Sequence, residues 1–269
     1  MKKLALFLLS VLAVSYVSAQ TGGTEKRVFE GAMILAQRNL SEDGKAFVKS
    51  FLGQSFYEDV QFLYNLEKKK QATHSADIHY LYLDKDFRPM KREGDDLIAK
   101  IEESMAIVRD REGRERQEVV NALRTIINLM SDMHLIGHVR LESVPHSMQD
   151  FKILCYSGDT PKYNKRKHPV TWSRFWSIYD AWHSGMTGAM WADDYEMAYG
   201  SKAKQYSAGS LHDWAADMGK TANEIYKWAA PDYEMPRIQR NDLKDFHFEQ
   251  MAKLGYRLAV MLDMLAQAQ

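Results

Sequence analysis

The stretch VVNALRTIINLMSDMHLIGH, residues 119–138, joins an amphipathic helical pattern to a short run with one aspartate and two histidines. Its apolar side chains recur every three or four residues, which predicts a helix with one face in the core. Gly137 interrupts this pattern just before His138. The apolar stripe consists of Val119, Leu123, Ile126, Ile127, Met130 and Met133.

The polar face of this helix has two interpretations. Asn128 and Asp132 are four residues apart, so they share a face. Periodicity alone favours a solvated face, on which Asp132 would be an ordinary surface carboxylate. The alternative is a chemical centre at this end of the helix, which other ionisable groups could reach only through folding. Those distant groups are His79, Asp180 and His183.

Helical periodicity extends over most of the remaining chain. Residues 77–83 have no clear helical period and predict a short strand or an extended passage through the interior. Residues 143–171 contain three prolines and predict a long excursion with a short strand near 151–155. The sum predicts a mostly α, single-domain, multi-helix fold with at most short strands. The expected helices cover 28–36, 41–53, 60–66, 97–108, 173–186, 210–228 and 243–266, with Ser41 and Ser210 as caps.

Composition limits the classes of function. The 269 residues are 45% apolar, enough to build a core, and the formal net charge is zero. The total charge therefore does not favour a strongly basic nucleic-acid binder or an acidic tail. Cys155 is the only cysteine, so a metal site would have to use His, Asp, Glu or a chain terminus.

The N-terminal residues 1–19 have the pattern of a secretory signal peptide. Lys2 and Lys3 precede an apolar run over residues 4–14, and small residues lead to a cut after Ala19. The apolar run is short for a membrane span. We therefore expect residues 20–269 to form one helical domain that is exported to the periplasm or the cell exterior, without membrane insertion.

Five segments carry a resemblance to a known family. They are the opening helices at 29–53, Ala-Asp-Ile-His-Tyr at 76–80, Ser-Asp-Met-His-Leu-Ile-Gly-His at 131–138, Trp-Ser-Ile-Tyr-Asp at 176–180 and Met-Ala-Lys-Leu-Gly-Tyr-Arg-Leu-Ala at 251–259. In order and spacing they resemble the S1/P1 nuclease family, which is structurally akin to zinc-dependent phospholipase C. The third segment resembles the family's Gly-Asp-Met-His-Gln-Pro-Leu-His signature.

The resemblance implies a secreted, largely helical zinc enzyme that cleaves single-stranded DNA or RNA or acts on nucleotides. Clustered zinc ions would activate a water molecule and neutralise charge on the phosphoryl oxygens. By matching position, His79 and Asp132 would bind one zinc ion, and His138 and Asp180 would bind a second. Asp132 would be the carboxylate on which hydrolysis depends.

Several ligand positions of the family are substituted in this chain, and the terminal tryptophan of a third zinc site is replaced by Gln20 at the expected mature start. One or two zinc ions at most are therefore expected. Two functions stay open: metal-dependent hydrolysis of phosphodiester bonds in single-stranded nucleic acid, or a metal-poor relative that uses the same cleft to bind a ligand or partner. Phospholipid hydrolysis is a weaker third alternative. The substituted positions are Phe29, Asn65, Asn128 and Trp176, with His134 and His183 as candidate replacements.

Overall fold

The structure, a computed structural model, describes residues 27–53, 56, 59–60, 62–73, 76–92, 96–144, 152–156, 167–171, 185–226 and 237–268. This part of the chain is mostly α, as predicted, and it also contains two short two-stranded sheets. The expected signal peptide at 1–19, the helix expected over 173–186 for most of its length, Asp180 and His183 lie outside the described residues.

The helices and strands have the following bounds. A first helix covers 27–39. The other helices are α2 (Glu42–Leu52), α3 (Phe62–Lys68), α4 (Leu97–Arg109), α5 (Arg116–Met133), α7 (Gly188–Tyr199), α8 (Ala203–Ser207), α9 (Leu211–Tyr226) and α10 (Arg237–Gln267). Short 3-10 turns are η2 (Ala76–His79), η3 (Arg111–Gly113), η4 (Ile136–His138) and η6 (Gly200–Lys202). The strands are β1 (Leu81–Leu83), β2 (Val139–Leu141), β3 (Lys152–Tyr156) and β4 (Lys167–Thr171).

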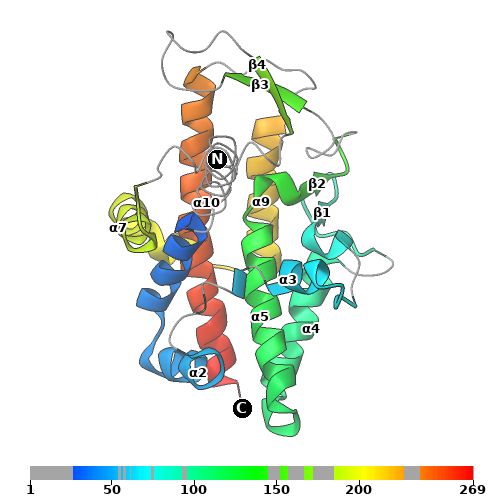
Figure 1. The fold of residues 1–269 in the computed structure, drawn as a ribbon, viewed down its shortest axis with the longest axis vertical. Helices are drawn as coiled ribbons and strands as arrows, with labels where there is room; N and C mark the ends of the chain where they lie inside the picture. Colours follow the sequence, from blue (N-terminus) through cyan, green and yellow to red (C-terminus); the bar gives the residue numbers. More distant parts are fainter. Residues whose placement is uncertain are drawn as a thin grey trace, which may run out of the picture.

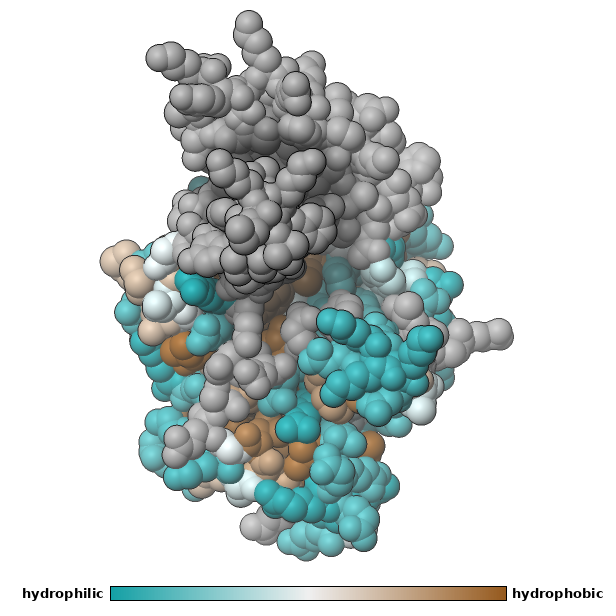
Figure 2. All heavy atoms as spheres, viewed as in Figure 1, coloured by the Kyte–Doolittle hydropathy of each residue, from teal (hydrophilic) through white to brown (hydrophobic). Residues whose placement is uncertain are grey.

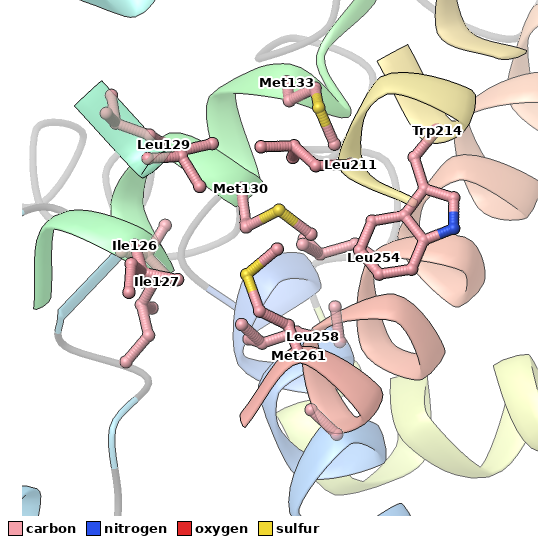
Figure 3. Close-up of a cluster of buried hydrophobic side chains, with 14 of the residues drawn as sticks. Ile126, Ile127, Leu129, Met130, Met133, Leu211, Trp214, Leu254, Leu258 and Met261 are labelled. Carbon is pink, nitrogen blue, oxygen red and sulfur yellow. The ribbon is translucent and has the colours of Figure 1, made fainter. Parts of the chain in front are cut away.

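The long helices α5, α9 and α10 run along the long axis of the molecule, with α4 beside α5 and with α2 and α7 against α10 (Figure 1). Apolar side chains from α5, α9 and α10 meet between them (Figure 3). Removing each such side chain from water is worth about 1.5–3 kcal/mol, so this cluster is a main source of stability. Its labelled members are Ile126, Ile127, Leu129, Met130, Met133, Leu211, Trp214, Leu254, Leu258 and Met261.

The second half of α5 is buried on all sides. Every residue from Thr125 to Met133 is buried, including Asn128 and Asp132. α3 and η2 pack against α5 and cover the face that periodicity assigns to solvent. The surface interpretation of Asp132 is therefore wrong, because segments far earlier in the chain exclude water from it.

Helix α2 begins and ends where the sequence predicts. The Ser41 hydroxyl accepts a hydrogen bond from the Gly44 amide (3.0 Å), and the chain leaves the helix at Gly53, with φ 85°. Asp263 of α10 accepts hydrogen bonds from the Ser41 amide (3.1 Å) and hydroxyl (2.7 Å). These contacts fasten the start of α2 to the end of the last helix.

The region without a clear period becomes the turn η2 followed by β1, which pairs with β2 in parallel. Leu81 and Leu83 lie opposite Val139 and Leu141, and all four are buried. The strand expected at 151–155 is β3, one residue later, and it pairs antiparallel with β4, which the sequence did not predict.

The described surface in one view is mostly hydrophilic, with apolar residues in a few places between polar ones (Figure 2). Among the described helices, none has both the length and the apolar character that crossing a membrane requires.

Candidate active site around His79 and Asp132

The parallel pairing of β1 with β2 places two predicted histidines side by side. His79 ends η2 just before β1, and His138 ends η4 directly before β2. Nδ1 of His138 lies 2.9 Å from the carbonyl oxygen of His79. Because a carbonyl only accepts, Nδ1 of His138 carries the proton and donates it. The sheet register thus joins segments that are 59 residues apart.

Asp132 in the last turn of α5 completes this group. Its side chain is buried, and Oδ2 lies 2.7 Å from Nδ1 of His79. Oδ1 lies 3.7 Å from Nδ1 of His138. The structure therefore brings together three of the four predicted metal ligands; the fourth, Asp180, lies outside the described residues.

Glu67 is a fourth member of the group that the sequence analysis missed. Its Oε1 lies 3.1 Å from Nε2 of His79, so the imidazole connects two carboxylates. The resemblance to S1/P1 nucleases instead places the early acidic ligand at Asn65, which is exposed here. Glu67 is a carboxylate two residues further along α3, and a shift of two positions would have found it.

Asn128 orients Asp132, and its carbonyl oxygen is directed at the backbone of α3. Its Oδ1 accepts a hydrogen bond from the backbone amide of Leu63 at 2.8 Å. This contact fixes the amide, so Nδ2 faces Asp132 Oδ2 at 2.9 Å and donates to it. Asn128 is therefore a support for the carboxylate rather than a replacement for the missing histidine.

Burial and nearby charges shift the pKa values of His79 and His138 in opposite directions. Burial lowers the pKa of His79, but hydrogen bonds and charges from Asp132 and Glu67 outweigh burial and raise it above its usual value. Burial lowers the pKa of His138, and Asp132 only partly compensates. His138 is therefore neutral at pH 7, whereas His79 holds a proton over a wider pH range than a solvated histidine.

His134 does not replace a missing ligand. The ring is fully buried, with Nδ1 2.8 Å from the Met130 carbonyl and Nε2 3.1 Å from Nη1 of Arg257. Burial and then the charge of Arg257 lower the pKa of His134 to about 3. Both nitrogens thus bind protein groups, which removes His134 as a candidate replacement ligand.

The donor types around His79 suit zinc, which prefers imidazole and carboxylate ligands. Within the described residues, however, no three His, Cys, Asp or Glu side chains are arranged to hold a metal ion. Both ring nitrogens of His79 already contact carboxylates. Zinc binding here therefore requires one hydrogen bond of His79 to be exchanged for a metal bond.

Aromatic and cationic side chains adjoin this group. Tyr80 follows His79, and its ring lies 5.5 Å from the ring of His138. The guanidinium of Arg140 lies 4.1 Å from the centre of the Tyr80 ring, and that of Arg92 lies 4.1 Å from the Tyr82 ring. The side of the site toward β1 and β2 is therefore aromatic and carries two arginines, together with the Asp77 carboxylate, to which Tyr82 donates at 3.2 Å.

No protein-family model and no curated protein matches this chain. The resemblance to S1/P1 nucleases consequently rests on the five segments, and the activity that it implies stays a prediction.

Proposed function

We propose that this chain is a metal-dependent hydrolase of phosphodiester bonds with a reduced centre of one zinc ion at His79 and Asp132. The observation that carries the proposal is the convergence of Glu67, His79, Asp132 and His138 from α3, η2, α5 and η4. α3 and η2 come from one part of the chain and α5 and η4 from another, with His79 and Asp132 53 residues apart, and a solvated surface acid would need no such arrangement.

His79 and Asp132 would hold the ion, and Asn128 would keep Asp132 oriented toward it. Glu67 would keep its contact with Nε2, the other ring nitrogen of His79. A bound zinc ion would supply a water molecule of lowered pKa and would offset charge on the phosphoryl group. His138 carries its proton on Nδ1, so Nε2 is the nitrogen that can accept a proton from water or substrate.

Single-stranded DNA or RNA is the substrate class that the surroundings support. Arg140 and Arg92 can neutralise phosphates near the site, and aromatic rings beside them can contact bases. The signal at residues 1–19 adds the proposal of an exported enzyme, which the presence of the chain in a periplasmic or culture fraction would test.

The direct test is hydrolysis of single-stranded DNA and RNA by the zinc-loaded chain, with Asp132→Asn and His79→Gln as variants. Both variants should lose activity, because each removes a proposed ligand. Asn65→Ala is the matched control, since its side chain is exposed on the same helix as Glu67, and it should keep full activity. Equal activity in the control and in Asp132→Asn would refute the proposal.

A second candidate is a metal-poor relative that binds a nucleotide or other ligand in the same place. Its supporting observation is that His79 already bridges two carboxylates and that the Asn128 oxygen is bound to the backbone. Calorimetry with nucleotides in the presence of a chelator tests it. Binding that persists without zinc and disappears in Arg140→Ala would favour this candidate over hydrolysis.

A further inference from the structure

Arg257 lies at the centre of a buried polar network behind the candidate site. Only 4% of the residue is exposed, and its three guanidinium nitrogens all have partners. Nη1 contacts Nε2 of His134 (3.1 Å), Nη2 donates to Asp217 (2.6 Å), and Nε donates to the carbonyl of Tyr206 (3.1 Å). One side chain of α10 thus joins α8, α9 and the end of α5.

Charges within this network balance. Lys253 donates to Asp217 at 2.9 Å and pairs with Glu249 at 3.2 Å. Tyr206 donates to the same Glu249 oxygen at 3.1 Å. Two cations therefore face two carboxylates, which offsets the cost of burying them. Lys253 shares Asp217 with Arg257, but its contacts do not include His134.

His134 connects this network to the candidate site. An arginine can only donate, so Nε2 of His134 accepts from Arg257, and Nδ1 must carry the proton that is donated to Met130. His134 also directly follows Met133, the last residue of α5, and caps this helix. Asp132 lies two residues before it and His138 four residues after it, at the end of η4. The ring therefore fixes the segment that carries both groups.

We propose that Arg257 is a positioning residue: through His134 it holds the end of α5 and the following turn in the conformation that directs Asp132 and His138 toward His79. The test of this role by zinc affinity rests on the proposed function, whereas the test by the NMR spectrum of the His138 ring does not. A network with a purely structural role would lower stability without changing the site selectively.

The first experiment separates the two hydrogen bonds of His134. In His134→Gln, the side-chain oxygen can take the place of Nε2 and accept from Arg257. In His134→Asn, the shorter amide can donate to Met130 but does not reach Arg257. The measurement is the ¹⁵N spectrum of the His138 ring in the metal-free, full-length chain.

The wild type and His134→Gln should show one His138 tautomer, protonated on Nδ1, because that nitrogen donates to the His79 carbonyl. His134→Asn should show a mixture of tautomers. An unchanged spectrum in His134→Asn would overturn the proposal.

The second experiment compares Arg257→Met with Lys253→Met, which removes a cation of the same network that does not touch His134. Both variants should lower the melting temperature. Zinc affinity should fall about 10- to 100-fold in Arg257→Met, as is typical when a supporting group is lost, and should stay unchanged in Lys253→Met.

Equal zinc affinity in the two variants would overturn the positioning role. If the wild type binds no zinc, that result contradicts the proposed function, and the His138 spectra of the His134 variants still decide the positioning role. If Arg257→Met does not fold, the same spectra decide it.

Discussion

Glu67 and Asn128 determine what His79 and Asp132 can do. Glu67 supplies a second carboxylate to the imidazole, and Asn128 holds Asp132 by an amide that is itself fixed by the backbone. Both contacts depend on atoms brought together by folding. At the position where the resemblance implies a metal-binding histidine, Asn128 therefore supplies a supporting hydrogen bond to Asp132.

The charge of Glu67 should be measurable at His79. Replacing Glu67 with Gln removes one of the two negative charges that raise the pKa of His79, so this pKa should fall. An NMR titration of the His79 ring in metal-free protein measures the shift. Asn65→Ala serves as the control and should leave the titration unchanged. A His79 pKa that is equal in Glu67→Gln and wild type would contradict the contact.

The buried His134 should make the fold sensitive to acid. Its pKa is about 3 in the folded chain and near 6.5 when solvated, so the unfolded chain binds an extra proton between these values. Stability from this residue is therefore present above about pH 6.5 and is lost as pH falls toward 3. His134→Gln keeps the Arg257 contact without the titration, and its unfolding midpoint should depend less on pH in this window. His212 is exposed, so His212→Gln is the control. An equal loss of pH dependence in His212→Gln would contradict the role of His134 in acid sensitivity.

At the scale of elements, periodicity and caps predicted α2, α4 and α5 well, because each carries its own signal. The Ser41 cap, the stop at Gly53 and the apolar stripe of α5 are local features. The burial of Asp132 was not predictable from α5 alone, because α3 and η2 supply the cover. The pairing of β1 with β2 was likewise not predictable, because both strands are short segments from distant parts of the chain. This pairing brings His79 to His138.

The start of α2 provides a test of packing against α10. Alanine is the better helix former by about 1 kcal/mol. Gly44→Ala should nevertheless destabilise the protein, because the added methyl group would displace the Asp263 carboxylate from its hydrogen bonds with Ser41. Gly113→Ala is the control, since its new carbon would meet only ordinary contacts. Denaturant unfolding compares the two variants. A Gly44→Ala protein as stable as wild type would contradict the close approach of α2 and α10.

At the scale of the whole molecule, one cluster of helices supports both the core and the candidate site. α5 packs its apolar stripe against α9 and α10 (Figure 3). Its last turn presents Asp132 to His79. The mostly α class followed from the sequence. The contact of Glu67 with His79 and the contact of His134 with Arg257 did not follow from it, because both depend on which helices meet around α5.

The central claim is that His79 and Asp132 form a zinc-binding centre, with Glu67 in contact with the other ring nitrogen of His79. Titration of zinc into the chelator-treated, full-length chain tests it most directly, with Asp132→Asn as the variant and Asn65→Ala as the control. We expect about one zinc ion to bind per chain in the wild type and in Asn65→Ala, and binding to be lost in Asp132→Asn. A folded wild type that binds no zinc, or equal binding in Asp132→Asn, would contradict the claim.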